Sequence, residues 1–339
     1  MHMKEKMAYG EYISDGRCAE KKEILKLIQT LGKGCDGIVF LGDQFHLKNN
    51  PSEVVREFVE FVEAFGDKQI YILAGNHEKF GDGKSAIDFM REVKKPNWHI
   101  ISSEVEKIGD MVFCPYFYKG ELGVATVKAA TQKLVKSLPE GRVLFAHHAV
   151  SDMKFNAMDT NLLNEIVLPR KTISKKYEWV VNGHIHVPVQ DDNILQVGSV
   201  FNNEVGEDGR FVNIIHIDKT ITVDQIPLPG RKILKFEDPD DDDLNAVSKL
   251  DGVPAIEHSI VKVVFTKSVT RKRINEIKSL LDGKCDSYII VEKLRNSERE
   301  KAHLDTIMSM SIEDLLRVYA KEKKIDPVKV LAGFKLIQS

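Results

Sequence analysis

The tetrapeptide Gly75-Asn76-His77-Glu78 directly follows the apolar run Ile70-Tyr71-Ile72-Leu73-Ala74, and this junction indicates a buried strand that ends in polar side chains. The same kind of junction recurs at Gly42-Asp43-Gln44-Phe45-His46, at His147-His148 and at Gly183-His184-Ile185-His186. In an α/β fold, ligands gather at the carboxyl ends of buried strands. Because Asp, Asn and His side chains bind divalent cations, four such strand ends predict a two-metal hydrolytic site.

The composition sets limits on the class of protein. The chain has 339 residues, long enough for two domains, with 42% hydrophobic and 29% charged residues. Its net charge of −2 predicts no global attraction to nucleic acid, so any DNA contact must use local patches. Cys18, Cys35, Cys114 and Cys285 have no C-x-x-C spacing, which predicts reduced structural thiols of a cytosolic protein. No apolar run approaches the ~18 residues of a membrane span.

The spacing of apolar residues predicts an α/β catalytic domain over residues 1–230. Val54, Phe58 and Phe61 repeat at helical spacing and indicate a helix over 51–65. After the fourth motif, the pattern changes to short strands. Helices followed by β-rich sequence favour a two-sheet β-sandwich flanked by helices. The other expected helices cover residues 18–31, 85–93 and 123–137, and the late strands cover 194–197, 211–217 and 221–226.

Three further segments follow this domain. An acidic run centred on residues 237–243 predicts an exposed linker over 231–256. Strand patterns at 259–265 and 287–294 enclose a helical pattern at 270–281, which predicts a small βαβ cap over 257–300. Residues 308–339 predict two short amphipathic helices, which dock either on their own chain or on a partner.

In their order and in their residues, the motifs resemble those of the metallophosphoesterase (calcineurin-like) superfamily, which are D-x-H, G-D, G-N-H-E/D, H and G-H-x-H. The resemblance spans about residues 2 to 225. The chain opens Met1-His2, so if His2 is the histidine of the first motif, the aspartate and the first buried strand are missing from this sequence. Alternatively, His2 is an ordinary terminal residue.

The resemblance implies a ligand for each motif. Asp43 is expected to bridge two ions, because Gly42 lets the strand end turn sharply toward them. His147 is preferred over His148, which points the other way if strand alternation continues. Oxygen and imidazole ligands without thiolate suit Mn²⁺, Fe or Zn²⁺, and Mn²⁺ is the expected metal. One ion would be held by His2, Asp43 and His186, and the other by Asp43, Asn76, His147 and His184.

Three further residues are candidates for catalysis. His77 follows the ligand Asn76, and because histidine as a residue type titrates near neutral pH, this residue is expected to stabilise or protonate the leaving alkoxide. Glu78 is expected to orient a histidine. His46 is expected to contact the substrate phosphate, with capping of the next helix as the alternative.

Gly42-Asp43-Gln44-Phe45-His46 and the segment Val197-Gly198-Ser199-Val200-Phe201-Asn202-Asn203-Glu204 resemble motifs of SbcD-type double-strand-break repair nucleases, including phage forms. The layout of catalytic domain, small cap and terminal helical pair is also similar. The resemblance implies a DNA exonuclease and endonuclease subunit in recombination, repair or replication. It also implies a homodimer, a cap that touches DNA and terminal helices that bind an SbcC-type coiled-coil ATPase.

Local basic stretches fit such a role, because basic side chains neutralise backbone phosphates without reading sequence. A solvated charged face is the alternative for each stretch. Two other functions remain open: a small-substrate phosphatase or cyclic-nucleotide phosphodiesterase, and an inactive truncated scaffold. The basic residues are Arg170, Lys171, Lys175, Lys176, Lys267, Arg271, Lys272 and Arg273.

Overall fold

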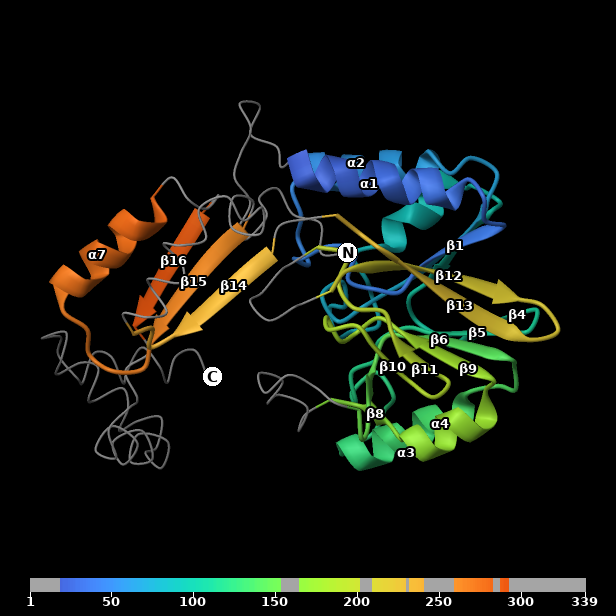
Figure 1. Cartoon of the computed structure of the whole chain (residues 1–339). Helices are drawn as coiled ribbons and strands as arrows, with labels where there is room; N and C mark the ends of the chain where they lie inside the picture. Colours follow the sequence, from blue (N-terminus) through green and yellow to red (C-terminus); the bar gives the residue numbers. More distant parts are fainter. Residues whose placement is uncertain are drawn as a thin grey trace, which may run out of the picture.

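A computed structural model describes residues 19–153, 165–201, 209–229, 232–240, 259–282 and 287–292. Within these ranges the chain forms a mixed α/β fold with several sheets and a separate small unit (Figure 1). The predictions for His2 and for residues 308–339 lie outside the described residues. No helix in the described ranges is long and apolar enough to cross a membrane.

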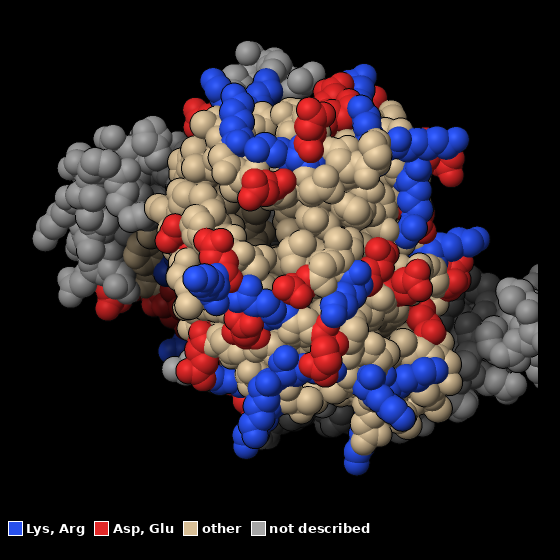
Figure 2. All heavy atoms as spheres, turned by 90° about the vertical axis from the view of Figure 1, so that its right-hand side faces the viewer, with Lys and Arg blue, Asp and Glu red and all other residues tan. Residues whose placement is uncertain are grey.

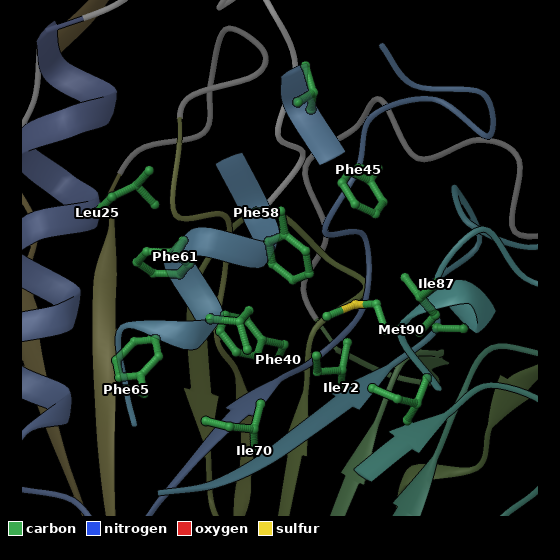
Figure 3. Packing of buried hydrophobic residues seen from close by; sticks show 14 of the residues in the cluster. Leu25, Phe40, Phe45, Phe58, Phe61, Phe65, Ile70, Ile72, Ile87 and Met90 are labelled. Carbon is green, nitrogen blue, oxygen red and sulfur yellow. The ribbon is translucent and has the colours of Figure 1, made fainter. Parts of the chain in front are cut away.

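The first sheet is three-stranded and parallel, with the order β1 (Gly37–Phe40), β2 (Gln69–Leu73), β3 (Trp98–Ile101). Helices α1 (Ala19–Gly32) and α2 (Ser52–Glu63) cover one face of it (Figure 1). The buried side chains of α2 recur every three or four residues, which gives the helix one apolar face. Phe58 and Phe61 on that face pack edge-on against Phe40 of β1 (Figure 3).

The second sheet has six strands in the order β10-β11-β9-β6-β5-β4. Helices α3 (Val127–Ser137) and α4 (Arg170–Lys176) pack on its outer face. Thr126 is the N-cap of α3: its side chain accepts a hydrogen bond from the Ala129 N–H. The strands are β4 (Glu106–Ile108), β5 (Met111–Cys114), β6 (Val143–Ala146), β9 (Trp179–Asn182), β10 (Val189–Asp191) and β11 (Ile194–Gln196).

The two sheets share an apolar cluster, because successive side chains of a strand point to opposite faces. In β2, Ile70 and Ile72 belong to the cluster under α1 and α2, whereas Tyr71 and Leu73 belong to the cluster shared with the second sheet. The rings of Tyr71 and Phe113 stack across the sheets with centroids 4.8 Å apart. The hairpin of β12 (Phe211–Ile217) and β13 (Ile221–Pro227) adds side chains to the shared cluster.

The C-terminal unit is a parallel sheet of β14 (Lys232–Glu237), β15 (Ser259–Phe265) and β16 (Ser287–Glu292), with helix α7 (Arg271–Leu281) packed on it. The acidic run predicts a linker that includes residues 232–237, but these residues form β14. Leu234 and Phe236 alternate along that strand and pack into the cluster under α7, which is enough to define an edge strand.

Some local elements differ from the sequence expectations. Within 85–93, only Asp88–Val93 is helical, and it is a 3-10 helix. The seven-residue α4 was not anticipated, because a single buried apolar residue, Ile173, gives no periodic signal. The parallel pair β7 (Ala149–Val150) and β8 (Val167–Leu168) was also missed, because strands of two residues are too short to show an alternating pattern.

Candidate metal centre

The four motifs follow β1 and β2 of the first sheet and β6 and β9 of the second. Each pair of strands is parallel, so their carboxyl ends lie at one edge of their sheet. The structure brings Asp43, His147 and His184 together from these ends, with one potential ligand atom of each lying within 4.8 Å of the others. One carboxylate and two imidazoles therefore gather where the two sheets meet.

The backbone turns sharply to place Asp43. Gly42 has φ +93° and Asp43 has φ +51°, so two successive residues adopt left-handed conformations. Glycine does this without strain, and aspartate is among the few other residues that tolerate it. The next motif approaches so closely that a Cβ on Gly75 would lie 2.1 Å from Asp43 Oδ1. Glycine at position 75 is thus required for the two motifs to touch.

His147 is oriented by the backbone of the first motif. Its Nδ1 donates to the carbonyl of Leu41, so Nδ1 carries the proton. Nε2 then presents its lone pair to two oxygens, Asp43 Oδ2 at 3.3 Å and Asn76 Oδ1 at 3.2 Å. Three electron-rich atoms facing one another repel unless a cation lies between them, so this donor set fits a divalent ion.

His184 completes the group. Its Nε2 lies 2.9 Å from Glu165 Oε2, and its Nδ1 is buried without a hydrogen-bond partner among the described residues. A buried unsatisfied nitrogen is unfavourable, and coordination of an ion would satisfy it. His186, in contrast, is not part of the gathered group; its carbonyl accepts the Ser199 N–H at 2.8 Å. With His2 outside the described residues, the described chain assembles the expected ligands of one ion.

The sequence predicts that Glu78 orients a histidine, but its carboxylate binds backbone N–H groups instead. Its carboxylate accepts hydrogen bonds from the backbone N–H groups of Asp43, Phe45 and Gly75 at 2.8–2.9 Å. It thereby holds the first two motif loops together, while Phe45 anchors the first loop against Phe58 in the core (Figure 3). Burial, followed by the neighbouring Asp43 carboxylate, raises the pKa of Glu78 to about 8, whereas the Phe45 and Gly75 N–H groups lower it.

His46 and His77 lie side by side, with ring centroids 5.4 Å apart. His77 Nδ1 donates to the His46 carbonyl at 2.7 Å, and the His77 N–H donates to Asp43 Oδ1 at 3.0 Å. This fixes the Nδ1–H tautomer of His77 and places its lone pair on Nε2. The alternative role of His46, capping of the next helix, is wrong, because α2 begins after Pro51 and no side chain caps it.

His148 has a structural environment distinct from that of His147. It is fully buried, its Nε2 contacts the Pro115 carbonyl at 3.1 Å, and its N–H donates to Asn182 Oδ1. Burial, reinforced by His184 and His147, lowers the pKa of His148 to about 3. A neutral His148 thus links the ends of β5, β6 and β9 behind the centre.

Sequence reasoning missed two residues at the centre, Glu165 and Tyr116. The Tyr116 ring stacks on His148 at 5.2 Å and lies 5.8 Å from the His184 ring. Burial raises the pKa of its phenol well above the usual range. Its place just after β5, beside β6, is the signal that could have found it. Glu165 has no motif around it and is found only through its contact with His184.

The basic residues of α4 are partly engaged. Arg170 forms ion pairs with Asp191 at 2.7 Å and Asp192 at 3.1 Å, and Lys176 donates to the Leu138 carbonyl. Lys171 and Lys175 are exposed. In the C-terminal unit, Arg271 and Lys272 are exposed and Arg273 donates to the Pro239 carbonyl. On the face shown in Figure 2, basic and acidic side chains are interspersed.

Paired parallel strand ends that carry oxygen and imidazole donors define a metal-dependent hydrolase centre. The family model for calcineurin-like phosphoesterases matches residues 1–205, and the chain belongs to that family. It is therefore a hydrolase acting on phosphoester bonds, and the family uses divalent metals. A comparison with curated proteins finds no match.

Proposed function

We propose that this chain is a metal-dependent DNA nuclease subunit of the SbcD type, with a two-sheet sandwich as its catalytic domain and two Mn²⁺ ions as its cofactors. Bound divalent cations would supply Lewis-acid polarisation of the phosphodiester and activation of water. The proposal rests chiefly on the paired imidazoles of His46 and His77 beside Asp43. His77 Nε2 can deliver a proton to a leaving alkoxide, and His46 can contact the phosphate.

The surroundings of this pair favour a nucleic acid over a small phosphate ester. Leu47 and Phe80, which follow the first two motifs, are 54% and 45% exposed. The Lys48 ammonium lies 5.9 Å from the Tyr118 ring centroid, and the Tyr118 hydroxyl donates to the Asn76 carbonyl. Exposed aromatic rings stack on bases, exposed aliphatic side chains make apolar contacts with them, and a lysine neutralises a backbone phosphate.

We further propose that the C-terminal unit is a cap that contacts DNA. Arg271 and Lys272 begin α7 and are both exposed, and Lys272, 88% exposed, forms a long ion pair of 3.9 Å with Glu276. A homodimer and an SbcC-type ATPase partner belong to the same proposal. They rest on the resemblance of motifs and layout alone.

The test compares linear duplex DNA, a plasmid, bis(p-nitrophenyl) phosphate and p-nitrophenyl phosphate with Mn²⁺. We expect hydrolysis of DNA and of the diester, and little of the monoester. Arg271→Ala/Lys272→Ala should weaken DNA binding without changing diester hydrolysis. It should also reduce the slope of log affinity against log salt concentration by the amount expected for about two phosphate contacts. Lys128→Ala/Lys133→Ala on α3 is the matched control. Efficient monoester cleavage with intact DNA would instead establish a small-substrate phosphatase.

A further inference from the structure

We propose that Glu165 is a positioning residue of the metal centre: its carboxylate holds the His184 ring so that Nδ1 is the nitrogen that would bind an ion. The inference rests on the metal dependence in the proposed function, but not on DNA as substrate. Nothing in the motifs assigns a role to Glu165, which lies 19 residues before His184 in the chain.

The hydrogen-bond chemistry selects one tautomer. Glu165 Oε2 lies 2.9 Å from His184 Nε2, and the two side chains are only 23% and 11% exposed. An ionised carboxylate can only accept, so Nε2 carries the proton and Nδ1 is left with its lone pair. That Nδ1 is buried and has no hydrogen-bond partner in the described part of the chain.

The two imidazoles of the centre are thus set in opposite senses. The Leu41 carbonyl accepts a hydrogen bond from the Nδ1–H of His147 and leaves the lone pair on Nε2, whereas Glu165 accepts a hydrogen bond from the Nε2–H of His184 and leaves the lone pair on Nδ1. The rings lie 5.1 Å apart and are inclined at 67°. The Tyr116 ring also packs against the His184 ring, with centroids 5.8 Å apart. Carboxylates in this role orient the ring and strengthen it as a ligand.

The test compares wild type with Glu165→Ala and Glu165→Gln by calorimetric titration of Mn²⁺ into the metal-free full chain. We expect Glu165→Ala to lower affinity at one site by about 10- to 100-fold. Glu165→Gln should lose less, because its amide oxygen can still accept a hydrogen bond from the Nε2–H of His184. Glu140→Ala removes an 83% exposed carboxylate and should leave affinity unchanged. Thermal unfolding of each variant verifies that it is folded.

A second measurement reports the tautomer directly. Nitrogen-15 NMR of the metal-free protein, with the signal assigned by His184→Gln, should show the Nε2–H form in wild type and a mixture in Glu165→Ala. Unchanged affinity and tautomer in Glu165→Ala would overturn the inference alone. Loss of one ion with an unchanged tautomer would also overturn it, because Glu165 would then be a ligand. Absence of Mn²⁺ binding by wild type would overturn the proposed function itself.

Discussion

Lys79 and Glu121 form an ion pair of 2.6 Å between side chains that are 0% and 6% exposed. Lys79 Nζ also donates to the Ser102 carbonyl at 2.9 Å, and Glu121 Oε2 accepts the Tyr118 N–H at 2.7 Å. The pair joins the residue after the Gly75-Asn76-His77-Glu78 motif to the loop that carries Tyr116 and Tyr118. It therefore fixes one wall of the centre.

Replacing one partner of this pair should be costly. Lys79→Met leaves the Glu121 carboxylate buried without its counter-charge, so we expect the free energy of unfolding to fall by roughly 3–5 kcal/mol in urea denaturation. Lys79→Met/Glu121→Leu should recover much of that loss. Lys95→Met breaks a pair with Glu63 in which both side chains are over 40% exposed, and should change stability by about 0–1 kcal/mol. A similar small effect for Lys79→Met would contradict the burial of the pair.

Asp43→Asn should abolish hydrolysis and weaken divalent metal binding, because it removes the carboxylate that His147 and His184 surround. Calorimetric titration with Mn²⁺ measures the loss. Asp218→Asn alters an exposed carboxyl of the β12–β13 turn and serves as the control. Two metal sites of undiminished affinity in Asp43→Asn would refute its assignment as the bridging ligand.

His77→Ser should reduce turnover of the diester by roughly 10²- to 10⁴-fold while leaving metal content intact, since a general acid is lost but no ligand. Metal content is measured on the purified variant by elemental analysis. His216→Ser removes a half-exposed histidine of the β12–β13 hairpin and should have no effect on turnover. Parallel loss of metal in His77→Ser would make His77 a ligand.

Gly75→Ala should disrupt the centre, because the new Cβ would lie 2.1 Å from Asp43 Oδ1 and 2.4 Å from its backbone nitrogen. We expect both weaker Mn²⁺ binding and a lower unfolding temperature. Gly120→Ala adds the same methyl group where no atom lies within 4 Å, and should be neutral. Normal metal binding by Gly75→Ala would show that the two loops are further apart than the structure places them.

Local patterns carry much of the fold and some of the centre. The apolar run before Asn76 specifies β2, and the position of Asp43, His147 and His184 after strands makes each of them a predicted ligand. Contacts between side chains distant in sequence leave no such pattern. Lys79 illustrates this, because lysine is almost never fully buried unless paired, and its partner lies 42 residues away. In the same way, Glu165 was missed and Glu78 was given the wrong role, because the tertiary fold sets their partners.

The ligand side chains come from both sheets: Asp43 and Asn76 follow strands of one, and His147 and His184 follow strands of the other. The apolar contacts between the sheets are non-directional and tolerate small shifts of one layer along the other. Coordination bonds are directional, so an ion bound by ligands from both sheets would hold the sheets in one relative position. Its removal would leave the hydrogen bond from His147 to the Leu41 carbonyl and the apolar contacts to hold the sheets together, so the alignment of the two halves of the domain should become less rigid when the metal is absent.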